Sequence, residues 1–249
     1  MMGIGLSALF GTAVVRDSRY FEVAGSCAGE HNLGHERLAQ MKLYSYIVTH
    51  DTGFAPNPFS GYCTLACCKP KIRLNAQKGD WVVGLTPRAA GNRIVYFMRV
   101  DEVLESFSKY WSDPRFRAKK PTYTDGLRKK CGDNIYEPQA SGGYRQLRSM
   151  HSNGELEHEG NKSHDLSGKR ILVSDTFAYF GSGALPLPTE LHSLIAQRGH
   201  RSRFSDEIKA EFIRFAGSVG FGVHGTPRQW PDGDDSPMKG CGCKTSKKK

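Results

Sequence analysis

The chain has 249 residues, of which 38% are hydrophobic and 10% aromatic, which is enough for one large domain or two small ones around a buried core. No stretch approaches the roughly 20 apolar residues of a membrane span, and the apolar start lacks the basic leading segment of a signal peptide. The seven cysteines are odd in number, and Cys67 and Cys68 are adjacent, which favours free thiols in a reducing compartment. We therefore expect a cytoplasmic protein without a membrane segment.

The first 40 residues show no sustained hydrophobic period and contain the polar, glycine-rich patch "GSCAGEHNLGHE". A clear β-run begins directly after Met41. We interpret residues 1–40 as an N-terminal extension, poorly ordered, with Met41 as a natural start. Residues 41–222 then form the folded body.

The body shows a mixed pattern of strands and helices. Strands are predicted at 43–48, 79–85, 93–103 and 169–181, and a short helix at 71–77. Residues 105–165 are polar and punctuated, and we expect mainly irregular segments there. A late helix is predicted from Ser205, its N-cap, to Gly217, its stop, with Ile208, Phe212 and Phe215 on one face. Residues 223–249 are predicted to be a basic, flexible tail.

The net charge of +10 is concentrated in the segment 109–130, which has eight basic residues against two acids. Four aromatic residues alternate with these cations. Because Lys and Arg neutralise phosphates while aromatic faces stack on bases, the segment favours binding to a polyanion. A solvated basic face is the alternative. The cations expected to contact a nucleic-acid backbone are Arg115, Arg117, Lys119, Lys120, Lys129 and Lys130.

Five motifs in fixed order carry a family resemblance over about 41–220. They are "YSYIVTHDTGFAPNPFSGYCTLACCKPKIR", "KGDWVVGL", "YWSDPRF", "CGDNIY" and "ILVSDTFAYFGSGA". In these the chain resembles the bacterial and phage family called nucleotide modification associated domain 2. The resemblance implies an association with DNA-base modification systems and phage defence, including protein partners of such a system.

The order of elements is also similar, more distantly, to PUA-like domains of the EVE and ASCH kind. These are small mixed barrels that read nucleic acids, in some members through an aromatic pocket around a modified base. The expected fold is therefore a single α+β domain, built on a small twisted sheet or a partly closed β-barrel with flanking helices. The expected ligand is a nucleic acid, DNA rather than RNA, or a nucleotide.

In such a base reader, the proline- and cysteine-rich loop 50–73 would form one wall of the pocket and the strand at Trp81 another. Aromatic faces would stack on a base, amides would bind its edge, and cations would hold phosphates. Core packing is the alternative for each aromatic side chain, and turn formation is the alternative for Asn57 and Asn134. The candidate nucleotide-binding residues are Phe54, Asn57, Tyr62, Lys69, Arg73, Trp81, Asp133 and Asn134.

An enzyme acting on a modified nucleotide or base is the second hypothesis, and an interaction module of a modification complex is a third. The weak catalytic candidates are Cys63, with Cys67 and Cys68 beside it, together with His50 and Asp133. Buried, inert thiols are the alternative. No nucleotide-cofactor motif is present, and we expect no cofactor. His151, His158, His164 and Asp165 have loose spacing, so we interpret them as a solvated polar loop and not as a metal site.

Overall fold

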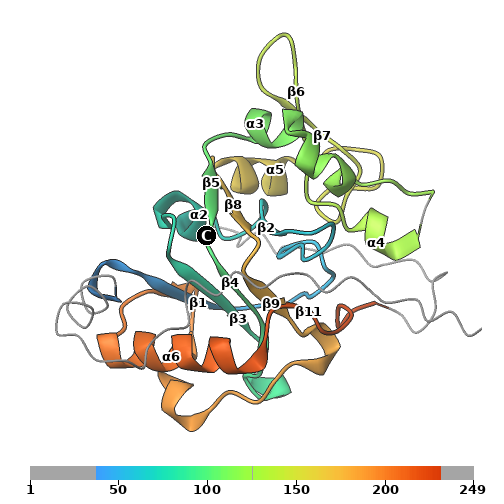
Figure 1. Cartoon of the computed structure of the whole chain (residues 1–249). Coiled ribbons are helices and arrows are strands. Elements are labelled where there is room, and N and C mark those ends of the chain that lie inside the picture. Colours follow the sequence, from blue (N-terminus) through green and yellow to red (C-terminus); the bar gives the residue numbers. More distant parts are fainter. Residues whose placement is uncertain (1–37, 125, 231–249) are drawn as a thin grey trace, which may run out of the picture. The chain divides into compact units, whose positions relative to one another are not determined.

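A computed structural model describes residues 38–124 and 126–230 of the chain (Figure 1). Its main element is a six-stranded mixed sheet with the order β10-β1-β3-β4-β9-β11. β1 pairs parallel with β3, which pairs antiparallel with β4. The strands of this sheet are β1 (Leu43–Ile47), β3 (Trp81–Leu85), β4 (Ile94–Arg99), β9 (Phe177–Tyr179), β10 (His200–Arg201) and β11 (Gly222–Val223).

Two smaller sheets complete the β-structure of the described residues. One has the order β2-β8-β5 and the other is the hairpin β6-β7. None of these sheets closes into a barrel, so the α+β class is confirmed and the twisted open sheet, of the two predicted forms, is observed. The strands are β2 (Cys63–Leu65), β5 (Glu102–Leu104), β6 (Tyr136–Pro138), β7 (Tyr144–Gln146) and β8 (Ile171–Ser174).

Short helices flank the sheets. Across residues 38–124 and 126–230, no helix is long and apolar enough to cross a membrane. The α-helices are α2 (Pro70–Asn75), α3 (Phe107–Ser112), α4 (Gly126–Lys130), α5 (Glu159–Leu166) and α6 (Asp206–Val219). The 3₁₀ turns are η1 (Arg88–Ala90), η2 (Pro114–Lys119), η3 (Gly181–Gly183) and η4 (Thr189–Leu194).

The main sheet is buried on both faces, because successive side chains of its strands alternate between two cores. Val82 and Tyr96 belong to one core, while Val83 and Phe97 belong to the other. The second core is covered by α6, which lies along the sheet in Figure 1 and contributes Phe212. The predicted late helix is therefore confirmed, but it runs past Gly217 and ends before Gly220, whose positive φ of 78° stops it.

Each of the two long predicted strands is divided between two sheets. β4 and β9 belong to the main sheet, whereas β5 and β8 pair with each other in the second sheet. The break is held by Asp101, whose Oδ2 accepts hydrogen bonds from the backbone N–H groups of Asp175 and Thr176. Both predicted strands therefore bend at the same point, and hydrophobic periodicity does not reveal this bend.

The segment 105–165 is more ordered than its polar composition indicates. It contains α3, η2, α4, the β6-β7 hairpin and most of α5. A third core lies beneath these elements and includes Phe107, Tyr110 and Tyr136 together with Phe54 and Cys67 from the loop 50–73. The expectation of mainly irregular structure was wrong here, because tertiary burial stabilises elements that are too short to be recognised from local pattern.

The residues after α6 contact the same loop. Arg228 N donates to Asp51 Oδ2, and the indole of Trp230 donates to Thr52 O and stacks on Phe59 with ring centroids 5.5 Å apart. Arg228 and Trp230 are therefore packed against this loop, and the boundary at 222 stays a prediction. The predicted N-terminal extension, up to residue 37, and the rest of the predicted tail, 231–249, lie outside the described residues.

Candidate functional site

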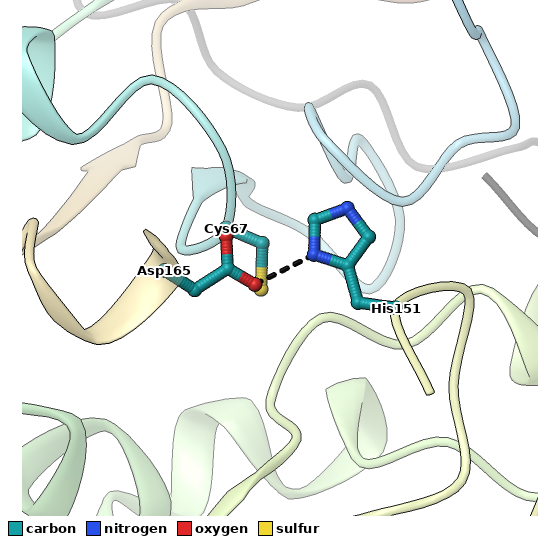
Figure 2. Close-up of side chains that lie close together, drawn as sticks. All are labelled: Cys67, His151 and Asp165. Atoms are coloured by element: carbon teal, nitrogen blue, oxygen red, sulfur yellow. Dashed lines mark hydrogen bonds and ion pairs between the residues drawn. The ribbon is translucent and has the colours of Figure 1, made fainter. Parts of the chain in front are cut away.

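Three side chains that are distant in sequence meet in one chain of polar contacts. Cys68 Sγ lies 3.4 Å from His151 Nε2, and His151 Nδ1 lies 2.6 Å from Asp165 Oδ2. Figure 2 shows the second contact, with the other ring nitrogen of His151 pointing away from Asp165. His151 and Asp165 are 1% and 0% exposed, whereas Cys68 is only partly buried. A thiol, a base and a carboxylate that orients the base form the arrangement used to activate a nucleophile.

The thiol is presented by an unusual backbone. Cys68 and Lys69 have φ angles of 60° and 41°, both in the left-handed region that side chains other than glycine rarely adopt. Two such residues in succession cost about 1–3 kcal/mol each and persist only where the surroundings enforce them. They connect β2 to α2, which begins at Pro70. The sharp turn leaves the Cys67 side chain in the core and places the Cys68 thiol at its edge.

Asp165, near the end of α5, holds the other two residues in register. Its Oδ1 accepts the backbone N–H of Cys68 at 2.7 Å, and its Oδ2 also accepts the hydroxyl of Tyr136 at 2.8 Å. Burial alone would raise the pKa of Asp165, but His151, the Cys68 amide and Arg73 hold it below its usual value. The carboxylate is therefore stabilised in its charged form.

His151, between β7 and α5, responds in the opposite direction. Burial alone would lower its pKa, yet negative charge at Cys68 and the hydrogen bond to Asp165 raise it well above the usual value. The ring also packs on Phe54, with centroids 4.7 Å apart. The site thus favours a protonated imidazole next to the Cys68 sulfur.

Arg73 holds the backbone at Cys68 and Asp165 in place from the protein interior. Its side chain is fully buried, and it donates from Nε to Cys68 O at 2.8 Å, from one terminal nitrogen to Arg170 O at 2.8 Å, and from the other to Asp165 O. A Cβ at Gly168 would lie 2.3 Å from the guanidinium, so this position needs glycine. Arg73 therefore joins the backbone of the thiol to the backbone of the carboxylate and lies away from the surface.

Cys67, His151 and Asp165 also meet the composition of a metal site, because their ligand atoms lie within 4.8 Å of one another. Two ligands of one tetrahedral zinc, each bound at roughly 2.1 Å, stand about 3.3 Å apart. The 2.6 Å between His151 Nδ1 and Asp165 Oδ2 is instead a hydrogen-bond distance. Burial, followed by the charges of Asp165 and Asp133, raises the Cys67 pKa well above its usual value, which favours the neutral thiol. His151 and Asp165 therefore fit a proton relay with Cys68 better than a metal site with Cys67.

The predicted catalytic candidates lie elsewhere. Cys63 is fully buried against Met98, and burial raises its pKa to about 12. Asp133 is buried and accepts hydrogen bonds from Thr64 and Tyr110, while His50 is exposed. The structure therefore brings none of these three into a nucleophile–base pair. It also corrects the interpretation of His151 and Asp165 as members of a solvated loop, since both are buried.

The predicted pocket residues are distributed over separate environments. Trp81 packs on Phe97 and Phe212 beneath α6, whereas Phe54 packs on His151 and Tyr62 on Phe116. Trp81 thus belongs to the second core, whereas Phe54 and Tyr62 both contact the third core.

The two predicted amides are internal. Asn57 is 1% exposed, donates to Cys131 O and accepts from Phe59 N, which pins the loop 50–73 to its surroundings. Asn134 donates to the backbone oxygens of Tyr110 and Phe116. Their side-chain groups are engaged within the protein.

The basic segment 109–130 is only partly free to contact a polyanion. Lys119 is buried and donates to Asn57 and to Tyr62 O, and burial, against the attraction of Asp133, lowers its pKa to about 8. Arg115 forms ion pairs with two acidic side chains. The remaining predicted cations are exposed or half-buried, and they are Arg117, Lys120, Lys129 and Lys130.

The fold and the site define an α+β domain with a Cys-His-Asp relay at the edge of its core. A family model described as nucleotide modification associated domain 2 matches residues 40–234, and the chain belongs to this family, as its motifs predict. A search of curated proteins finds no match, and neither does a search of solved structures. The family name establishes an association with nucleotide modification.

Proposed function

We propose that the protein is a thiol-dependent enzyme of nucleotide modification that transfers or hydrolyses an acyl group. Cys68 is the nucleophile, His151 the general base and acid, and Asp165 the residue that orients the imidazole. The observation that carries this proposal is the continuous contact from the partly exposed Cys68 thiol through His151 to the buried Asp165 carboxylate. The enzyme hypothesis is thereby favoured over a pure base reader, whose predicted aromatic residues are divided between two cores.

The chemistry follows from these roles. His151 takes the thiol proton, and the thiolate attacks the carbonyl carbon of an ester, amide or thioester. His151 then returns the proton to the leaving oxygen, nitrogen or sulfur, leaving a thioester on Cys68. Water or a second nucleophile, deprotonated by His151, resolves the thioester and releases the thiol. The Cys68 amide donates to Asp165, so the developing oxyanion needs donors other than this N–H.

The proposal is tested by asking which thiol reacts. With iodoacetamide at neutral pH, Cys68 is expected to be alkylated faster than free cysteine and before Cys63, Cys67 and Cys131, which are buried with raised pKa values. Peptide mapping by mass spectrometry reads the order. Cys68→Ser should abolish the fast phase. A fast phase at another described cysteine, or a Cys68 rate equal to that of free cysteine, would refute the proposal.

We also propose a nucleic-acid contact surface on the basic segment. It is supported by cations stacked on aromatic faces: Lys120 Nζ lies 3.6 Å from the Trp111 ring centroid, and Arg148 lies 3.9 Å from that of Tyr123. Such pairs can contact both phosphates and bases.

This second proposal predicts DNA binding that falls steeply between about 50 and 200 mM salt. Lys120→Ala should weaken binding to all sequences alike, as measured by fluorescence anisotropy with labelled oligonucleotides. Lys78→Ala, which removes an exposed lysine outside the basic segment, serves as the control. Binding that ignores salt, or that Lys78→Ala weakens equally, would contradict the proposal.

A further inference from the structure

A cluster of cations lies next to the nucleophile. Lys69 follows Cys68 directly, and its Nζ lies 4.6 Å from the ring centroid of Tyr46 on β1. Lys71, two residues further on in α2, is exposed. The same left-handed turn that presents the thiol thus brings a lysine onto β1, the strand next to the edge of the main sheet.

His200 joins the two lysines from the other side. It lies on the edge strand β10 directly opposite Tyr46, and its ring centroid is 6.0 Å from that of Tyr44. Burial lowers the pKa of His200, and the charges of Lys71 and Lys69 lower it further, so both ammonium groups act on this imidazole. The two lysines therefore create a local excess of positive charge beside an imidazole whose protonated form they disfavour.

Two buried tyrosines of β1 lie beneath these side chains. Tyr44 and Tyr46 project from β1 on the same face, because residues two apart on a strand share a side. The Tyr44 hydroxyl is buried and has no hydrogen-bond partner among the described residues. A buried hydroxyl without a partner is costly, and it indicates a place where a small displacement would let a ligand oxygen bind.

We propose that Lys69, Lys71 and His200 bind a phosphate of the substrate and thereby place its reacting carbonyl at Cys68. This inference rests on the proposed function and specifies its substrate class: an acylated molecule that carries a phosphate. The phosphate belongs either to a free nucleotide or to a nucleic-acid backbone. Ammonium and imidazole donors near one point bind phosphate oxygens through charge-assisted hydrogen bonds. Arg73, predicted to hold a phosphate, is replaced in this role by Lys71 and His200, because it is committed to backbone oxygens.

The test measures binding of four kinds of probe to the full chain by calorimetry. The probes are the four deoxynucleoside 5′-monophosphates, the corresponding nucleosides, inorganic phosphate and a short single-stranded oligodeoxynucleotide. We expect phosphate-bearing probes to bind at least about tenfold more tightly than nucleosides. Preference for mononucleotides indicates a free nucleotide as substrate, and preference for the oligonucleotide indicates a nucleic-acid strand.

Variants locate the binding. Lys69→Ala with Lys71→Ala should weaken the phosphate-bearing probes by about tenfold or more, and Lys71→Ala alone, at an exposed position, by severalfold. Lys78→Ala removes the same charge three residues before β3 and should change nothing. The inference is overturned if nucleosides bind as well as nucleotides, if no phosphate-bearing probe binds, or if Lys78→Ala matches the double variant.

The rate of Cys68 alkylation, measured on the same proteins, distinguishes a failure of the inferred substrate class from a failure of the proposed thiol chemistry. Fast, His151-dependent alkylation without phosphate binding overturns only the substrate class. Phosphate binding at Lys69 and Lys71 with an unreactive Cys68 overturns the proposed thiol chemistry and leaves a phosphate site.

Discussion

His151→Ala is expected to lower the rate of Cys68 alkylation at pH 6 by about 100-fold, because a free thiol with a pKa near 8.5 is less than about 1% ionised at that pH. In the native chain the imidazole lies 3.4 Å from the sulfur and can take its proton. The measurement is the pseudo-first-order rate of iodoacetamide adduct formation at Cys68, followed by mass spectrometry across pH 5 to 9. His164→Ala is the control, because His164 is an exposed histidine that directly precedes Asp165 in the sequence.

The role of Asp165 is tested with the variant Asp165→Asn. The amide keeps the volume but cannot favour the imidazolium, so burial then dominates and the His151 pKa should fall from well above 6.5 toward or below it. Long-range nitrogen–proton NMR of the ring reads this shift. The raised His151 pKa stabilises the folded protein fully below pH 6.5, and the lowered Asp165 pKa stabilises it above pH 3.8. The variant should therefore lose most stability between these two pH values. An unchanged His151 pKa would contradict the proposed role of the carboxylate.

Arg73→Met is expected to reduce the free energy of unfolding by about 3–5 kcal/mol, because it leaves three backbone oxygens without their charged donor in a buried setting. Methionine retains much of the apolar stem, so the loss reports the guanidinium. Denaturant unfolding followed by tryptophan fluorescence measures it.

Arg198→Met, at an exposed arginine, is the matched control and should stay within about 0.5 kcal/mol of the native chain. If Arg73→Met folds, its Cys68 alkylation rate should also fall, since the guanidinium joins the backbone of Cys68 to that of Asp165. A change in unfolding free energy no larger than that of the control would show that Arg73 does not hold the site together.

The family and the main elements could be predicted from the sequence, because the signals that indicate them are local. β1, β3, α2 and α6 were predicted near their observed positions, because hydrophobic period and turn residues are local signals. The divided strands were not, since their break depends on Asp101 contacting residues more than seventy positions away. The amount of regular structure in the polar segment 105–165 was underestimated for the same reason, because that structure depends on long-range contacts.

The candidate site shows most clearly which features the sequence predicts and which only the folded structure reveals. Composition identified the loop 50–73 as exceptional, and the cysteines in it as possible nucleophiles, but it gave no means of choosing Cys68 over Cys63. That choice depends on burial and on the distance to His151, which lies 83 residues further along the chain. His151 and Asp165 were visible only as widely spaced polar residues, because the spacing of a relay in space has no counterpart in sequence spacing.

Short-range forces encode the features that can be read from the sequence: family membership, the class of fold, and a local excess of positive charge. Which polar side chains lose water and meet depends on tertiary packing. Burial raises the Cys63 pKa and leaves that thiol inert, engages Asn57 and Lys119 within the protein, and brings Cys68, His151 and Asp165 into contact. Desolvation and long-range contacts are properties of the folded chain, and the candidate chemistry depends on both.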